Sequence, residues 1–109
     1  VEKFIGKKFE SLRFAGGGAL SDVWAQSYAD ILKIPIHQMA DPVQVTCKGA
    51  GLIGFVRLGH LKLEDIPERA RIRKTFKPIE ANFAVYDKLY GQFREIFKKN
   101  QSVFNVLNG

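Results

Sequence analysis

Cysteine and long apolar runs are nearly missing from this chain of 109 residues, and each shortage excludes a class of protein. Cys47 is the only cysteine, so no disulfide can form within the chain, and we expect a reducing, cytoplasmic location. The longest apolar stretch, from Gly49 to Val56, is far shorter than the roughly 20 residues that a membrane-spanning helix needs. Histidine is also scarce, and His37 and His60 are isolated, with no ligand spacing that indicates zinc. We therefore expect no membrane partner and no metal site.

Acidic residues are fewer than basic ones, 11 against 17, and the resulting net charge of +6 favours anionic partners in general. The densest basic run extends from Arg69 to Lys74, and we interpret it as part of a solvated connector. Nucleic-acid binding by this run is an alternative, and it predicts an affinity that falls steeply with salt. No aromatic residue is interleaved within the run to stack on bases, so we expect no nucleic-acid partner.

The first part of the chain predicts a strand, a helix and a second strand. The first strand covers residues 9–15, which are mainly apolar. Ser21 is a good N-cap for the helix that follows, and Pro35 ends this helix. The segment "PIHQMA", residues 35–40, then predicts a short second strand. A strand–helix–strand unit of this kind indicates parallel strands.

A second helix is predicted from about Val43 to Leu58, with Gly59 placed to end it. Because the helix is apolar nearly all round, we expect it to be mostly buried. Cys47 on this helix is then a small apolar side chain in the interior. A polar connector without clear periodicity follows at residues 59–79, with one short helical turn within it.

The last predicted helix begins near Glu80, and Lys98 and Lys99 suit its C-terminal end. It carries large apolar residues at helical spacing, which we interpret as a packing stripe. The stripe consists of Phe83, Tyr86, Leu89, Tyr90, Phe93, Ile96 and Phe97. The complete order predicts an α/β fold in which short parallel strands pack with helices, followed by a long C-terminal helix. The edges of so small a sheet need partners.

Three consecutive glycines, Gly16 to Gly18, join the first strand to the first helix. A turn without side chains lets a ligand approach the backbone, and the helix N-terminus behind it offers unpaired amides, as in many nucleotide sites. Two common phosphate-binding motifs do not fit, because the turn lacks both the Gly-Lys-Ser/Thr ending of a Walker loop and the third glycine of the dinucleotide fingerprint. A turn that is rich in glycine for packing alone is the alternative.

No Lys or Arg lies between Arg13 and Lys33, and Asp22 is the only charged residue near the start of the helix. An uncompensated carboxylate at the start of the helix would repel a β- or γ-phosphate. We therefore expect the turn to bind the nucleoside end of a nucleotide, with at most its α-phosphate. The polyphosphate, the metal and the catalytic base would then be held by other parts of the protein.

The segment "RFAGGGALSDVWAQSYADILKIPI" resembles the adenosine segment of the FGGY carbohydrate kinases, and most closely that of their xylulose kinase branch. The later segment "TCKGAGLIG" resembles the family's Thr-Ala-x-Gly-Ala-Ala helix, and "FKPIEANFAVYDKLYGQFREIF" resembles the branch's C-terminal helix. The matching residues are Gly16, Gly17, Gly18, Ala19, Ser21, Trp24, Gln26, Ala29, Asp30, Thr46, Gly49, Ala50, Pro78, Asn82, Tyr86 and Tyr90.

This resemblance implies that residues 1–109 are part of the C-terminal domain of an actin-like, ribonuclease H-like ATPase fold. Residues 1–58 would form a nucleotide segment, residues 59–79 a connector and residues 80–109 the C-terminal helix. The site residues that the resemblance implies are those of the glycine turn, which would line the adenosine and α-phosphate of ATP or ADP, and a serine that would make a polar contact to adenine. They are Gly16, Gly17, Gly18, Ala19 and Ser21.

The function that the resemblance implies is that of a C-terminal piece of an ATP-dependent carbohydrate kinase. The whole enzyme would phosphorylate a hydroxyl of xylulose, or of a related ketose or sugar acid. The family's phosphate loop, its base aspartate and its sugar pocket are absent from this chain, so we assign no catalytic residue and expect the fragment alone to be inactive. Magnesium and the sugar would be bound by the missing parts.

A non-catalytic interaction module is the alternative function. In that case the glycine turn is structural, and the aromatic C-terminal helix mediates association. A homodimer is compatible with both functions.

Overall fold

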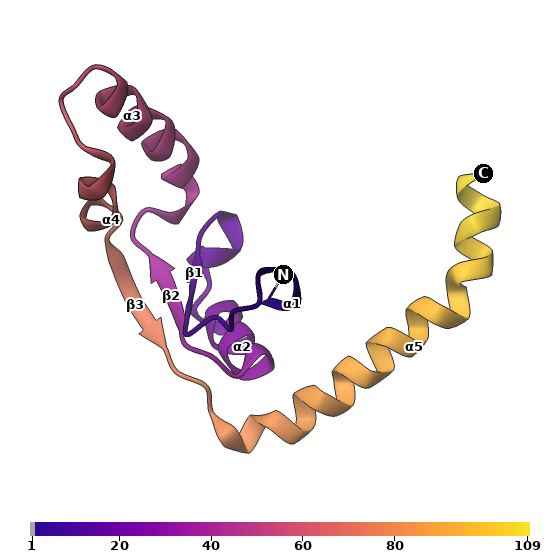
Figure 1. The fold of residues 1–109 in the computed structure, drawn as a ribbon. Coiled ribbons are helices and arrows are strands. Elements are labelled where there is room, and N and C mark those ends of the chain that lie inside the picture. Colours follow the sequence, from indigo (N-terminus) through magenta and orange to yellow (C-terminus); the bar gives the residue numbers. More distant parts are fainter. Residues whose placement is uncertain (1) are drawn as a thin grey trace. The chain divides into compact units, whose positions relative to one another are not determined.

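The computed structural model describes residues 2–109, which fall into two units, one ending at Pro78 and the other comprising Ile79–Gly109. Figure 1 shows a small mixed sheet with short helices in the first unit and one long helix in the second. The strands are β1 (Leu12–Phe14), β2 (Ile36–Met39) and β3 (Ile72–Phe76). The helices are α1 (Glu2–Ile5), α2 (Asp22–Leu32), α3 (Val45–Arg57), α4 (Ile66–Arg69) and α5 (Phe83–Asn108).

The sheet has the order β1-β2-β3, with β2 in the centre. β1 pairs with β2 in parallel, as expected for a strand–helix–strand unit, and β3 pairs with β2 in the antiparallel direction. The core of this unit lies between α2 and the sheet. It consists of Ala25 and Ala29 from α2, Ile36 from β2 and Phe76 from β3, with Leu12 and Phe14 packed against them.

The ends of the helices follow the local signals in the sequence. The Ser21 Oγ atom accepts a hydrogen bond from the Trp24 backbone N–H at 3.3 Å, which confirms the predicted N-cap of α2. α2 ends at Leu32, and the following residue, Lys33, adopts a left-handed conformation two residues before Pro35. Gly59 has φ +79°, the conformation that a glycine adopts just after a helix end, and it follows α3 as predicted.

β3 is the element that sequence reasoning missed, because it lies inside the predicted connector at residues 59–79. The helical turn expected there is present as a 3₁₀ turn at Leu63–Asp65 followed by α4. β3 has only one buried side chain, Phe76, while its other residues are exposed. An edge strand with this pattern shows little alternation of apolar and polar residues, so its sequence does not distinguish it from a solvated loop.

The prediction that α3 is mostly buried is wrong, since the structure buries none of its residues, and Cys47 is exposed. Ile53, Phe55 and Leu58 are 65%, 51% and 72% exposed. The apolar composition of α3 is as expected, but no other element among the described residues covers most of it.

α5 forms the second unit together with a 3₁₀ turn at Glu80–Asn82. The predicted start near Glu80 is therefore confirmed, but the helix continues past Lys98 and Lys99 to Asn108. None of its residues is fully buried, and the predicted packing stripe is half-buried at Phe83 and Tyr86 and exposed from Leu89 onwards. Among residues 2–109, no helix has the length and apolar character needed to cross a membrane.

Candidate functional site

The glycine turn connects β1 to α2 and is held in place by backbone hydrogen bonds. Gly16 has φ 89° and ψ −176°, a combination that essentially only glycine adopts. Its N–H donates to the Pro42 carbonyl at 2.8 Å, and its carbonyl accepts from the Ala19 N–H at 3.0 Å. Gly17–Leu20 then form a 3₁₀ turn that leads into α2.

The three glycines lack a side chain for different physical reasons. Gly16 is required by its backbone conformation. A Cβ atom on Gly18 would lie 2.8 Å from Cε3 of Trp24, so Gly18 is required by packing. A Cβ atom on Gly17 would meet nothing within 4 Å, and its φ is not positive. Neither backbone conformation nor packing within the chain therefore explains the glycine at position 17.

The other two predicted site residues, Ala19 and Ser21, lie on the same turn but have structural contacts of their own. Ala19 is fully buried, and its carbonyl accepts a hydrogen bond at 2.8 Å from Nε2 of Gln38 on β2. Ser21 caps α2 through its hydroxyl oxygen. The structure thus brings all five predicted residues together, with Gly16 and Gly17 facing open space.

Asp22 carries the negative charge nearest to the turn, and the prediction that it is uncompensated is wrong. Its Oδ2 atom accepts a hydrogen bond at 2.9 Å from Nζ of Lys74, and its Oδ1 atom accepts one at 3.1 Å from Nε2 of Gln38. Nη1 of Arg73 lies 3.7 Å from Oδ1. Both cations come from β3, the strand that was not predicted, so sequence spacing could not reveal them.

These contacts lower the pKa of Asp22, with the hydrogen bond from Lys74 as the largest cause and that from Gln38 next. The carboxylate therefore stays ionised at neutral pH, next to two cations. Charge repulsion by Asp22 therefore does not limit the turn to a nucleoside, because a negative charge paired in this way no longer repels a phosphate strongly.

The pairing of Asp22 predicts a pH effect. Because the pKa of Asp22 is lower in the folded chain than in the unfolded chain, the pair stabilises the fold above the unfolded-state pKa, and this contribution is lost as the pH falls through the folded-state pKa. We expect Lys74→Met to raise the Asp22 titration midpoint towards the ordinary value of about 3.9, measured by NMR of the carboxyl carbon. Arg57→Met, which removes an exposed cation at the end of α3, should leave the midpoint unchanged. An equal midpoint in wild type and Lys74→Met would contradict the pairing.

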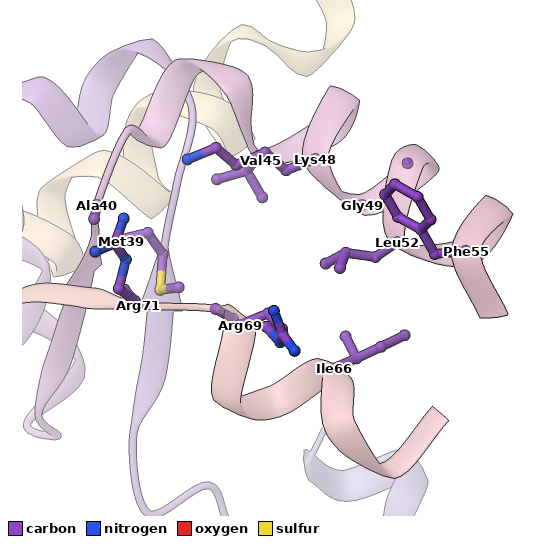
Figure 2. Close-up of a pocket in the computed structure, with 12 residues that line it drawn as sticks. Met39, Ala40, Val45, Lys48, Gly49, Leu52, Phe55, Ile66, Arg69 and Arg71 are labelled. Carbon is purple, nitrogen blue, oxygen red and sulfur yellow. The ribbon is translucent and has the colours of Figure 1, made fainter. Parts of the chain in front are cut away.

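A separate pocket of about 450 Å³ lies between α3, α4 and the ends of β2 and β3. Figure 2 shows Leu52 and Phe55 from α3 on one side and Ile66 and Arg69 from α4 on the other. Its lining is mainly apolar and does not include the glycine turn. The turn is therefore an open surface, distinct from this apolar pocket.

The part of the chain that the structure describes, residues 2–109, contains no group of three or more His, Cys, Asp or Glu placed to hold a metal ion. Nδ1 of His37 lies 2.8 Å from Oγ1 of Thr75, across the β2–β3 pair. The ring of His60 makes an edge contact with Phe55.

Sugar kinases are similar to this chain both in sequence and in structure, although no known protein-family profile matches it. Autoinducer-2 kinase of Salmonella paratyphi B is 28% identical over 107 residues, which cover 94% of this chain and 20% of that protein. Ribulokinase of Bacillus licheniformis is 31% identical over 101 residues, covering 84% of this chain and 18% of that protein. The crystal structure of ligand-bound xylulose kinase from Lactobacillus acidophilus matches with a TM-score of 0.80 and 26% identity, covering 93% of this chain and 21% of that one.

Sugar kinases thus match this chain in sequence, and a xylulose kinase matches its fold over nearly the whole chain. The chain is homologous to a segment of the carbohydrate kinases of the FGGY family. Its mixed α/β fold agrees with the predicted C-terminal domain segment of an actin-like ATPase. The chain spans about a fifth of the length of the relatives it matches.

Proposed function

We propose that this chain is the nucleotide-proximal segment of an ATP-dependent carbohydrate kinase, in which Gly16, Gly17, Gly18, Ala19 and Ser21 line the adenosine and α-phosphate. The observation that carries the proposal is the open space at Gly17. Neither packing nor backbone conformation requires a glycine at this position. A nucleotide lying across the turn would use this space, since its atoms approach the backbone closely there.

The charges around the turn support the same role. Lys74 and Arg73 offset the carboxylate of Asp22, so the start of α2 offers a phosphate its backbone amides without net repulsion from that side chain. In this proposal the nucleotide-proximal unit extends to Pro78, because β3 supplies both cations, rather than ending at Leu58 as the sequence predicted.

ATP supplies the transferred phosphoryl group, and this chain would position its nucleoside end. No three His, Cys, Asp or Glu side chains within residues 2–109 are grouped to hold an ion, and we derive no step through the metal. Magnesium, the base and the sugar would be held by residues outside this chain, so the fragment alone is proposed to be inactive. The substrate class is xylulose or a related ketose or sugar acid, and the location is cytoplasmic.

The test is an ATP-dependent phosphorylation assay on the full-length protein that contains this chain. We expect phosphate transfer to at least one member of a panel of ketoses, sugar acids and polyols, measured as ADP release coupled to NADH oxidation. The 109-residue chain alone is the control and should show none. Absence of sugar-dependent ADP release from the folded full-length protein would contradict the proposed function.

A non-catalytic interaction module is the second candidate, and the exposed apolar face of α5 is the observation that favours it. Leu89, Phe93 and Phe97 are 57%, 69% and 59% exposed on this helix. If this face joins two copies of the chain, the full-length protein would be a dimer in light scattering and would release no ADP in the sugar panel. A monomer that phosphorylates a sugar would exclude the module.

A further inference from the structure

Among residues 2–109, Gln38 on β2 is the one fully buried polar side chain that reaches the glycine turn from outside it. It is 0% exposed, and its Nε2 group donates two hydrogen bonds, to the Ala19 carbonyl at 2.8 Å and to Oδ1 of Asp22 at 3.1 Å. The first acceptor belongs to the turn, and the second is the first residue of α2. One amide therefore ties the end of the turn and the start of the helix to the central strand.

Asp22 extends this connection to β3. While Oδ1 accepts from Gln38, Oδ2 accepts from Lys74 at 2.9 Å. A continuous chain of contacts thus runs from β3 through the carboxylate and the amide to the backbone of the turn. Because hydrogen bonds to a charged group are stronger than neutral ones, the carboxylate fixes the orientation of the Gln38 amide that holds Ala19.

The amide oxygen of Gln38 indicates that this side chain does more than fill the interior. Its Oε1 atom is buried and has no hydrogen-bond partner among the described residues. A buried acceptor left unpaired is unfavourable, and a methionine of nearly the same volume would fill the same space without one. What glutamine provides and methionine does not is the pair of N–H donors aimed at the turn and at Asp22.

We propose that Gln38 is a positioning residue that sets the shape of the glycine turn for the nucleotide. This inference rests on the proposed function, since it concerns the same turn. Gln38 does not touch the nucleotide in this proposal. It holds the Ala19 carbonyl, and with it the 3₁₀ turn that begins at Gly17, in the geometry that leaves Gly16 and Gly17 open.

The test compares Gln38→Met with Gln26→Met in the full-length protein. Gln26 is a matched control, because its Nε2 group also donates two hydrogen bonds, to Oδ1 of Asp30 at 2.8 Å and to the Lys77 carbonyl at 2.9 Å, neither of which belongs to the turn. Both variants lose two hydrogen bonds, and thermal unfolding of each is measured so that ADP binding is compared on folded protein. We expect the Kd for ADP, measured by calorimetry, to rise about tenfold in Gln38→Met, from the loss of two ordered bonds, and to stay within twofold of wild type in Gln26→Met.

A kinetic readout separates positioning from a merely structural role. With a sugar that supports turnover, Gln38→Met should raise KM for ATP while kcat and KM for the sugar stay near wild type. A variant that only lowered the folded fraction would lower kcat and leave both KM values unchanged. If Gln38→Met does not fold, Gln38→Asn serves instead, because its amide is one methylene too short to reach both acceptors.

The Gly17→Leu variant distinguishes failure of this inference from failure of the proposed function. If Gly17→Leu weakens ADP binding and Gln38→Met does not, the positioning role is wrong and the nucleotide site stands. If neither variant changes the Kd for ADP, the turn does not bind the nucleotide, and both proposals fail. A loss in Gln38→Met without one in Gly17→Leu would also overturn the inference, because Gln38 would then act on something other than the turn.

Discussion

The Gly17→Leu variant of the full-length protein should bind ADP roughly tenfold to a hundredfold more weakly than wild type, with little loss of stability. A Cβ atom at this position would meet nothing within 4 Å, so we expect the folded chain to accommodate the leucine. The side chain would instead occupy the space in front of the turn, where the proposed nucleotide lies. Forcing extra atoms into a filled contact costs about 1–3 kcal/mol, which corresponds to this range of affinity. Calorimetry with ADP measures the change.

The neighbouring glycines provide controls that should behave in the opposite way. Gly18→Ala places a Cβ atom 2.8 Å from the Trp24 ring, and Gly16→Ala imposes φ 89° on a residue with a side chain. Each should destabilise the fold by about 1–3 kcal/mol in urea titrations. Wild-type ADP affinity in a folded Gly17→Leu protein would show that the open space serves no nucleotide.

The three glycines also show which features of the candidate site could be predicted from the sequence and which could not. Three glycines between a strand and a helix were enough to locate the turn, because the signals for β1, the Ser21 cap and α2 are local. The sequence could not tell which of the three is free for a ligand. That distinction depends on the Trp24 ring above Gly18, which is a matter of three-dimensional packing.

The electrostatics of the turn could not be predicted because its partners are distant in the sequence. Lys74 lies 52 residues from Asp22, and Gln38 lies 19 residues from Ala19. Both contacts depend on strand pairing, and β3 itself has too little alternation to be recognised locally. The basic run of Arg69 to Lys74 was interpreted as part of a solvated connector, and the contacts of Arg73 and Lys74 with Asp22 were not anticipated.

The exposed surfaces of α3 and α5 have a similar origin. The sequence predicted apolar faces on both helices, and both are present, but apolar composition does not say what covers them. Within residues 2–109 the faces are largely uncovered. Exposed apolar faces of this extent are typical of surfaces that pack against another protein segment.

Phe76→Ala should be the most destabilising single substitution that we propose, at about 3–5 kcal/mol, the usual range for removing a buried phenylalanine. Phe76 is 6% exposed and packs with Ala25, Ala29 and Ile36 in the core between α2 and the sheet. It is also the only buried residue of β3, so its loss should release the strand that carries Lys74 to Asp22. Urea unfolding followed by fluorescence of Trp24, the chain's only tryptophan, measures the effect.

Ile72→Ala on the same strand is the matched control. Ile72 is 45% exposed and pairs with Met39 near the other end of β3, so its truncation should cost about 1 kcal/mol. Phe76→Ala should in addition raise the NMR titration midpoint of Asp22, as Lys74→Met does, whereas Ile72→Ala should leave it near the wild-type value. Equal destabilisation by the two substitutions, with an unchanged Asp22 midpoint, would contradict this prediction. It would mean that the packing of Phe76 is not what holds β3, and with it Lys74 and Arg73, next to Asp22.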